Sequence, residues 1–187
     1  MQLTLTGNRA WNSDFCAPDG RLLYRVRMSN RKASLFKATS SGQLANLAEI
    51  EFHAVRPTKI TVPGKGVTNS TVFFRKGRLG WKGRDRIFTG PSGLEYRWKL
   101  HKKFSELYTN DIAKAFVARY HPRTSHFLQA STPAYLEVSE GGLEMLDLII
   151  ITFVYIEKIR EEKGAREGGE EAGDFGDGGG GGGGGGT

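Results

Sequence analysis

Short segments in which apolar and polar residues alternate fill the first 140 residues, with Gly, Pro, Asn or Ser between them. A period of two is typical of strands that bury one face, and these four residue types favour the turns that connect strands. Leu94–Leu100, for example, reads LEYRWKL and follows the turn sequence GPSG. The spacing predicts an all-β sandwich or barrel. We expect strands at Gln2–Thr6, Leu22–Met28, Ser34–Thr39, Ala48–Ala54, Lys59–Val62, Ser70–Arg75, Arg86–Thr89, Leu94–Leu100, Phe104–Tyr108, Ala115–Tyr120 and Ala134–Val138.

Residues 143–163 break this pattern and read LEMLDLIIITFVYIEKIREEK. From Leu148 to Ile156 only Thr152 is polar, which fits either a buried strand or a helix that is apolar on every face. The length of the segment, without Gly or Pro, favours the helix, and such a helix must be surrounded by protein. A membrane span is the third interpretation, but the uncharged stretch is far shorter than the roughly 20 residues that a span needs.

Two further residues bear on this predicted helix. Asp147 needs a partner, such as an Arg or a Tyr, if it is buried. If it lies instead in the first helical turn, the helix dipole and solvent stabilise its charge. Gly164 follows Lys163 and is typical of a residue that ends a helix.

Composition divides the chain after residue 163. Most of the 26 Gly lie in residues 164–187, which carry one Arg against five acidic residues and almost no apolar side chain. Such a segment cannot offset the entropy of ordering, so we expect a flexible, disordered acidic tail. The formal net charge of +7 therefore divides into about +11 for residues 1–163 and −4 for the tail. Residues 1–163 are expected to form one basic domain.

The sequence also resembles an uncharacterised family. RIFTGPSG at 86–93, followed by YRWK at 96–99, is similar to the FTGPDGR-x-Y-x-W core of a domain of unknown function that is abundant in mushroom-forming fungi. LAEIEFH at 47–53 and PAYLEV at 133–138 resemble further segments of it, and the likeness spans about 2–163. That family in turn resembles the tubby and phospholipid-scramblase-like superfamily. The resemblance implies a closed antiparallel β-barrel around a central hydrophobic C-terminal helix.

The strongest charge cluster is the sequence RKGRLGWKGRDR at 75–86, with a net charge of +5. Clustered cations can neutralise the phosphates of lipid headgroups or of nucleic acid, and an aromatic residue among them can lie at a membrane interface or stack on a base. A solvated loop that only confers solubility is the alternative. The candidate lipid- or polyanion-binding residues are Arg75, Lys76, Arg78, Trp81, Lys82, Arg84 and Arg86.

Smaller basic groups also occur. Arg25 and Arg27 share one face of a predicted strand, and His101 precedes two Lys residues. A solvent-facing surface is the simpler interpretation of both groups. Tubby-like domains are associated with phosphoinositides, so the resemblance favours an anionic phospholipid over nucleic acid as the ligand of residues 75–86.

Motifs for other chemistry are missing from the sequence. No GxSxG, Walker A or HExxH spacing occurs, and the single Cys16 excludes an internal disulfide and a multi-Cys zinc site. We therefore expect a non-enzymatic binding module without catalytic residues, cofactor or metal. The first residues lack the apolar run of a secretory signal, which predicts a cytoplasmic protein, peripheral to a membrane or nuclear. Its ligand is expected to be an anionic membrane lipid such as a phosphoinositide, or alternatively nucleic acid or a protein.

Overall fold

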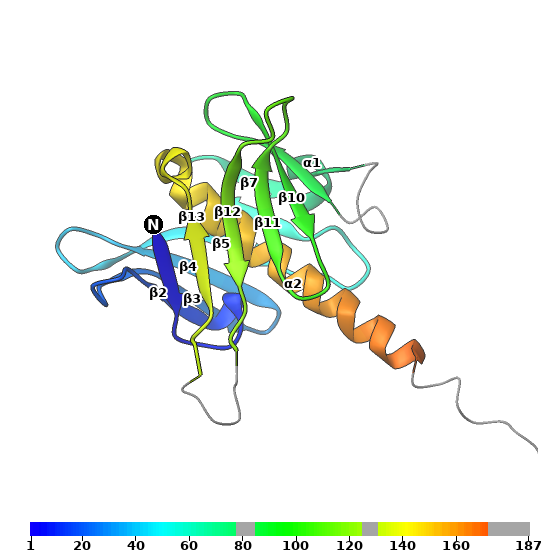
Figure 1. Ribbon diagram of the computed structural model, residues 1–187, viewed down its shortest axis with the longest axis horizontal. Coiled ribbons are helices and arrows are strands. Elements are labelled where there is room, and N and C mark those ends of the chain that lie inside the picture. Colours follow the sequence, from blue (N-terminus) through cyan, green and yellow to red (C-terminus); the bar gives the residue numbers. More distant parts are fainter. Residues whose placement is uncertain (78–84, 125–130, 172–187) are drawn as a thin grey trace, which may run out of the picture.

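The computed structural model describes residues 1–77, 85–124 and 131–171, with side chains as far as residue 164. Thirteen strands form one antiparallel sheet in the order β7-β6-β5-β4-β3-β2-β1-β13-β12-β11-β10-β9-β8 (Figure 1). The prediction of a mainly β fold is confirmed. The strands are β1 (Gln2–Leu5), β2 (Ser13–Cys16), β3 (Leu22–Ser29), β4 (Lys32–Ala38), β5 (Leu44–Glu51), β6 (Lys59–Val62), β7 (Gly66–Asn69), β8 (Arg75–Lys76), β9 (Arg86–Thr89), β10 (Glu95–Leu100), β11 (Ser105–Thr109), β12 (Phe116–His121) and β13 (Tyr135–Val138).

Four helical segments complete the described chain. Three are short: the 3-10 helix η1 (Ala10–Asn12), the single turn α1 (Ser70–Phe73) and the 3-10 helix η3 (Glu140–Met145). The fourth, α2 (Leu146–Glu171), is the long C-terminal helix. None of the helices in the described residues combines the length and the apolar character that a membrane crossing requires.

The sheet is open, so the prediction of a closed barrel is wrong. Within the described residues, β7 pairs only with β6 and β8 only with β9, and no ladder joins these two edges. The expected strand Ser70–Arg75 is also wrong, because its first four residues form α1. The buried Phe74 that follows α1 stacks on Tyr155 of α2, with ring centres 4.7 Å apart. The chain between β7 and β8 thus packs on the helix instead of continuing the sheet.

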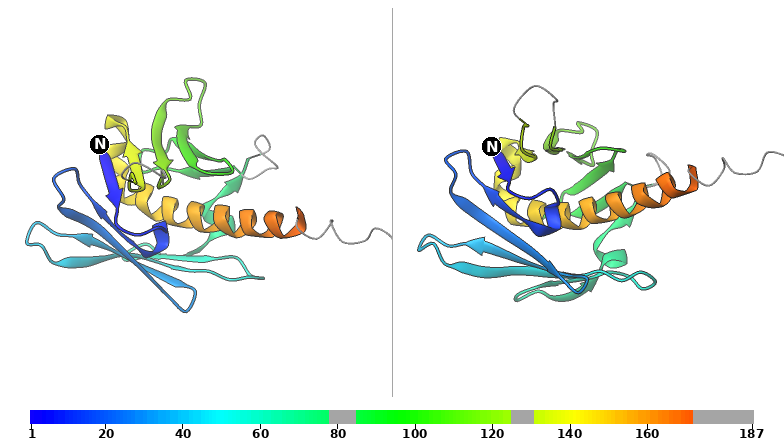
Figure 2. Two further views of the ribbon diagram at one scale, coloured as in Figure 1. Left: turned by 60° about the horizontal axis from the view of Figure 1, so that its bottom comes forward. Right: turned by 90° about the horizontal axis from the view of Figure 1, so that it is seen from below.

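Helix α2 lies within the curve of the sheet, which passes on both sides of it (Figure 2). Every side chain from Ile149 to Glu157 is buried, as the sequence predicts for a helix that is apolar on every face. The ring of Phe153 alone contacts Phe15 of β2, Trp98 of β10 and Tyr120 of β12. Each such side chain contributes about 1.5–3 kcal/mol to stability when it is buried. Because α2 buries so many of them against several strands, it forms the centre of the core.

Polar residues fix the position of α2 within this core. The indole Nε1 of Trp98 donates a hydrogen bond of 3.0 Å to Oγ1 of Thr152, whose hydroxyl in turn bonds backbone oxygens of its own helix. Five residues further along α2, the buried carboxylate of Glu157 accepts hydrogen bonds from Ser105 Oγ at 2.7 Å and from the guanidinium of Arg160. A buried carboxylate is tolerated only when it is paired in this way.

Asp147 is half-buried at the start of α2 and has two partners on the sheet. Its Oδ1 accepts a 2.6 Å hydrogen bond from the hydroxyl of Tyr24, and its Oδ2 lies 2.9 Å from Nζ of Lys37. Asp147 also stands in the first turn of α2 and its side chain is 43% exposed, so the explanation by the helix dipole and solvent applies, and the Tyr contact adds to it. Burial and this hydrogen bond both raise the pKa of Tyr24.

The end of α2 differs from the sequence-based expectation. The helix does not stop at Gly164 but continues to Glu171. The helix thus includes three Gly, at 164, 168 and 169, each of which costs about 1 kcal/mol in a helix interior, while the residues between them are good helix formers. An ion pair of 3.1 Å between Lys158 and Glu162 supports the preceding turn. The expected disordered tail lies, for residues 172–187, outside the described residues and stays a prediction.

An ion-pair cluster joins β2 to β3. Arg25 donates two hydrogen bonds, of 2.9 and 2.8 Å, to the carboxylate of Asp14, and Arg27 lies 2.7 Å from the same carboxylate. The two arginines therefore share a face, as predicted. The hydrogen bonds from Arg25 hold the pKa of Asp14 below its ordinary value of 3.8, although burial opposes them.

Replacing Ile150 with Asp should abolish the folded state. Ile150 is fully buried, and an uncompensated buried carboxylate costs on the order of 4 kcal/mol or more, against a total stability of about 5–15 kcal/mol for typical domains. Circular dichroism during urea unfolding measures the effect. Ile112→Asp is the matched control, because Ile112 is fully exposed, and it should fold normally. Equal stability of the two Asp variants would contradict central burial of α2.

Replacing Asp14 with Asn should destabilise the fold in a pH-dependent way. The folded-state pKa of Asp14 is lowered, so its contribution is present above the unfolded value and is lost as the pH falls through the folded value. We expect a loss of about 1–3 kcal/mol at neutral pH that disappears in acid. Urea unfolding at several pH values tests this. Asp19→Asn is the exposed control. If the difference in free energy of unfolding between the unchanged protein and Asp14→Asn stays constant with pH, this explanation is wrong.

Candidate anion-binding site

The predicted basic residues fall into two groups. Arg78, Trp81, Lys82 and Arg84 lie outside the described residues. The other three residues belong to strands at one edge of the sheet: Arg75, Lys76 and Arg86.

These three described residues differ in accessibility. Arg75 is exposed and donates hydrogen bonds of 2.8 and 2.9 Å to the two carboxylate oxygens of Glu95 on β10. Lys76 is exposed, whereas Arg86 is buried and donates a hydrogen bond to the backbone oxygen of Asp85. Of the three, Lys76 and Arg75 can therefore meet a ligand from solvent, and Arg86 supports the local fold.

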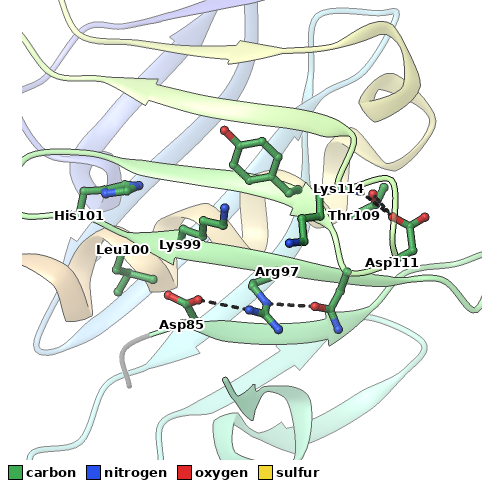
Figure 3. A pocket seen from close by; sticks show the side chains of 10 residues that line it. Asp85, Arg97, Lys99, Leu100, His101, Thr109, Asp111 and Lys114 are labelled. Carbon is green, nitrogen blue, oxygen red and sulfur yellow. Dashed lines mark hydrogen bonds and ion pairs between the residues drawn. The ribbon is translucent and has the colours of Figure 1, made fainter. Parts of the chain in front are cut away.

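Directly beside this edge, a pocket of about 460 Å³ lies on the outer face of β10 and β11 (Figure 3). Strand alternation builds it. Tyr96, Trp98 and Leu100 point into the core, so the residues between them, Arg97 and Lys99, point outward. The pocket is lined by Asp85, Arg97, Lys99, Leu100, His101, Tyr108, Thr109, Asn110, Asp111 and Lys114.

Neighbouring side chains hold the guanidinium of Arg97 in place. Its Nε donates a 3.0 Å hydrogen bond to Oδ1 of Asn110, and its Nη1 lies 3.8 Å from a carboxylate oxygen of Asp85. Asn110 in turn donates to the carboxylate of Glu95. Arg97 thus has a fixed orientation within the pocket, as Figure 3 shows.

Two ammonium groups of the pocket form no close ion pair with a carboxylate of the described residues. Nζ of Lys99 lies over the ring of Tyr108, 4.5 Å from its centre. Lys114 is exposed on the turn between β11 and β12. Within the part of the chain that the structure describes, neither ammonium group forms an ion pair with a carboxylate. Both are therefore available to an anion that enters the pocket.

Asp85 supplies negative charge at one end of the pocket. It is only 3% exposed, and burial raises its pKa, while the positive charges of Arg97, Lys99 and His101 act in the opposite direction. In its ionised form this carboxylate reduces the positive potential of the pocket. Asp85 also directly follows the undescribed residues 78–84, so the pocket adjoins the predicted basic segment along the chain.

The imidazole of His101 is fixed at the same end. Its Nε2 lies 3.0 Å from Oε2 of Glu106, and its ring stacks on Phe104 with centres 4.4 Å apart. Glu106 also lies 3.4 Å from Nε of Arg119 on β12. These contacts leave Lys99 and Lys114 as the pocket's available cations, with Arg97 as an oriented hydrogen-bond donor.

At the opposite end, hydrogen bonds order the turn from Asn110 to Ala115. The hydroxyl of Thr109 donates to Asp111 at 2.7 Å, and the backbone N–H groups of Lys114 and Ala115 donate to Asp111 and Thr109 respectively. The hydrogen bonds from Thr109 and Lys114 lower the pKa of Asp111. The turn therefore presents Lys114 from a defined backbone.

Sequence reasoning found the basic character of this region but missed the pocket. Arg97 and Lys99 look like the solvent side of an ordinary strand, and Lys114 is a single cation in a turn. The pairing of β10 with β11 brings these three residues together. Arg97 stands opposite Tyr108, and Tyr96 stands opposite Thr109, after which the turn that carries Lys114 begins. Alternation of two cations on one strand face is the only signal in the sequence that points to them. Among the described residues, no three His, Cys, Asp or Glu side chains converge as they do in a metal site.

Comparison with known proteins identifies a family. No curated protein and no solved structure matches this chain. The family described as "Family of unknown function (DUF6593)" matches residues 8–162, which is most of the chain. The expected likeness to an uncharacterised family is thus confirmed, whereas no comparison links the chain to tubby-like proteins or to fungi. The chain belongs to this family of unknown function, DUF6593.

Proposed function

We propose that the chain is a non-enzymatic binding module that takes a phosphate-bearing anion, in the first place a phospholipid headgroup, at the pocket on β10 and β11. The observation that carries this proposal is the pair of ammonium groups of Lys99 and Lys114, which share one pocket and, among the described residues, form no close ion pair with a carboxylate. Asp85 and Asp111 offset part of the positive charge that Arg97, Lys99 and Lys114 bring to this pocket, and a bound phosphate would offset the remainder.

The chemistry and the size of the pocket agree with such a ligand. A phosphate accepts hydrogen bonds from several cationic donors at once, and Arg97 is held with part of its donor fork facing the pocket. A volume of about 460 Å³ is within the usual range of small-molecule sites, roughly 300–1,000 Å³. One phosphorylated headgroup therefore fits the pocket better than an extended polymer does.

The basic segment 75–86 belongs to the same proposal. Asp85 connects it to the pocket, so Arg78, Lys82 and Arg84 are close to the pocket along the chain. Additional lysines and arginines near an anionic membrane contribute about 1 kcal/mol each. Trp81 would then act at the membrane interface, where Trp is enriched.

Nucleic acid is the alternative ligand. Stacking of bases requires an aromatic face that is open to the ligand, and in this pocket the face of Tyr108 is covered by Lys99. The same ring also packs against Phe116 in a T-shaped arrangement, with ring centres 6.0 Å apart. The site therefore favours phosphate recognition without stacking. The resemblance to an uncharacterised fungal family, which is in turn distantly similar to tubby and scramblase-like domains, is part of this proposal and rests on the sequence motifs alone.

Replacing both Lys99 and Lys114 with Gln should weaken binding of soluble inositol trisphosphate by about tenfold or more. Each lost cation should cost about 1 kcal/mol of binding free energy. Isothermal titration calorimetry at constant salt measures the affinity. The matched control replaces Lys59 and Lys65 with Gln, which removes the same charge from exposed positions on β6 and its following turn.

Asp85→Asn should act in the opposite direction and strengthen the same binding several-fold, because it removes negative charge beside the pocket. Equal effects of the two double Gln variants would show that only net charge matters and would contradict the pocket. Tighter binding to single-stranded RNA than to inositol trisphosphate, lost in the Lys99 and Lys114 variant, would favour the nucleic-acid alternative.

A further inference from the structure

Ile112 is the most exposed large apolar side chain in the described structure. It stands at the tip of the turn between β11 and β12 and is 101% exposed. Leu94, in the turn between β9 and β10, is 53% exposed. Single exposed apolar residues are common on protein surfaces. These two indicate a binding surface only if they lie close to the pocket.

The sheet register brings the two turns to the same end of the sheet. Tyr96, near the start of β10, stands opposite Thr109 at the end of β11. The backbone N–H of Asn110 donates a 2.8 Å hydrogen bond to the backbone oxygen of Glu95, the residue after Leu94. The turn at Gly90–Leu94 and the turn at Asn110–Ala115 are therefore neighbours, and both project beyond the sheet in Figure 1.

The tip that carries Ile112 is held by its own hydrogen bonds. The carboxylate of Asp111 accepts from the hydroxyl of Thr109 and from the backbone N–H of Lys114. Lys114 also has a left-handed backbone, with φ of 47°, which reverses the chain there. Ile112 is consequently presented to solvent by an ordered turn, and the charge of Asp111 is partly compensated within that turn.

Lys114 connects this tip to the pocket. It lies two residues from Ile112, and its side chain lines the pocket together with Lys99 and Arg97. We infer that this surface docks on an anionic membrane, with Ile112 inserted among the lipids while the pocket holds a headgroup phosphate. This inference rests on the proposed function and identifies the source of the phosphate as a lipid.

The combination of features favours a membrane over a free phosphate compound. A soluble phosphate needs the cations but gains nothing from an exposed Ile. At a membrane, apolar side chains enter about 5–10 Å into the boundary between headgroups and acyl chains, and cations interact with the headgroup phosphates above them. The tip and the pocket provide these two parts on one surface.

The experiment measures sedimentation with vesicles of phosphatidylcholine that contain phosphatidylserine and phosphatidylinositol bisphosphate. Ile112→Ser should reduce the partition coefficient by about tenfold, from the lower range of 1.5–3 kcal/mol for burying an Ile side chain. The matched control is Val55→Ser, because Val55 is 97% exposed on the connection between β5 and β6, in the other half of the sheet. It should bind vesicles like the unchanged protein.

Binding of soluble inositol trisphosphate separates this inference from the proposed function. Ile112→Ser should bind the soluble headgroup normally, because its pocket is intact. If Ile112→Ser and Val55→Ser sediment equally while the soluble headgroup binds, membrane insertion is wrong and the pocket stands. If the unchanged protein binds neither the soluble headgroup nor the vesicles, the proposed function fails and the inference fails with it.

A second variant reports insertion directly. Ile112→Trp places a fluorophore at the tip, and its emission should shift to shorter wavelength on mixing with the anionic vesicles. The spectrum of the unchanged protein, which has three Trp residues, is subtracted as the reference. Absence of the shift under conditions in which the variant sediments with vesicles would overturn the assignment of Ile112 to the membrane.

Discussion

The apolar run of α2 must be covered on every side, and the rest of the architecture follows from this requirement. No single flat sheet can surround a helix, so thirteen antiparallel strands curve until both halves of the sheet pack on it. Closure by hydrogen bonds between the two edge strands is not needed. Phe74 and Tyr155 stack where β7 and β8 would otherwise meet, so side chains shield the helix at that position.

The sequence predicts this core better than it predicts the edges. Period-two alternation and the apolar run identify most strands and the buried helix, because both patterns arise from burial itself. The sequence does not predict the turn α1, because Ser-Thr-Val-Phe contains β-branched and aromatic residues that favour a strand. Packing of Phe74 on α2 overrides that preference. Whether the sheet closes depends on contacts between distant segments, which no local pattern encodes.

The candidate site is only partly predictable from the sequence, because it too depends on contacts between distant segments. A cluster of charges at 75–86 is visible in the sequence, and four of its seven named residues lie outside the described chain. The pocket beside it depends on strand register, since Lys99 lies on β10 and Lys114 on the turn after β11, and they meet only through the pairing of β10 with β11. A one-residue slip of that pairing would turn Lys99 toward the core.

β10 therefore connects the core to the proposed binding surface. Trp98 points inward and bonds Thr152 of α2, while its neighbours Arg97 and Lys99 point outward into the pocket. The buried hydrogen bond fixes the rotation and register of the strand, and with them the direction of both cations. A rigid strand held from inside presents charged groups at defined positions, which lowers the cost of ordering them around an anion. In this way the requirement to cover α2 also prepares the outer face for a ligand.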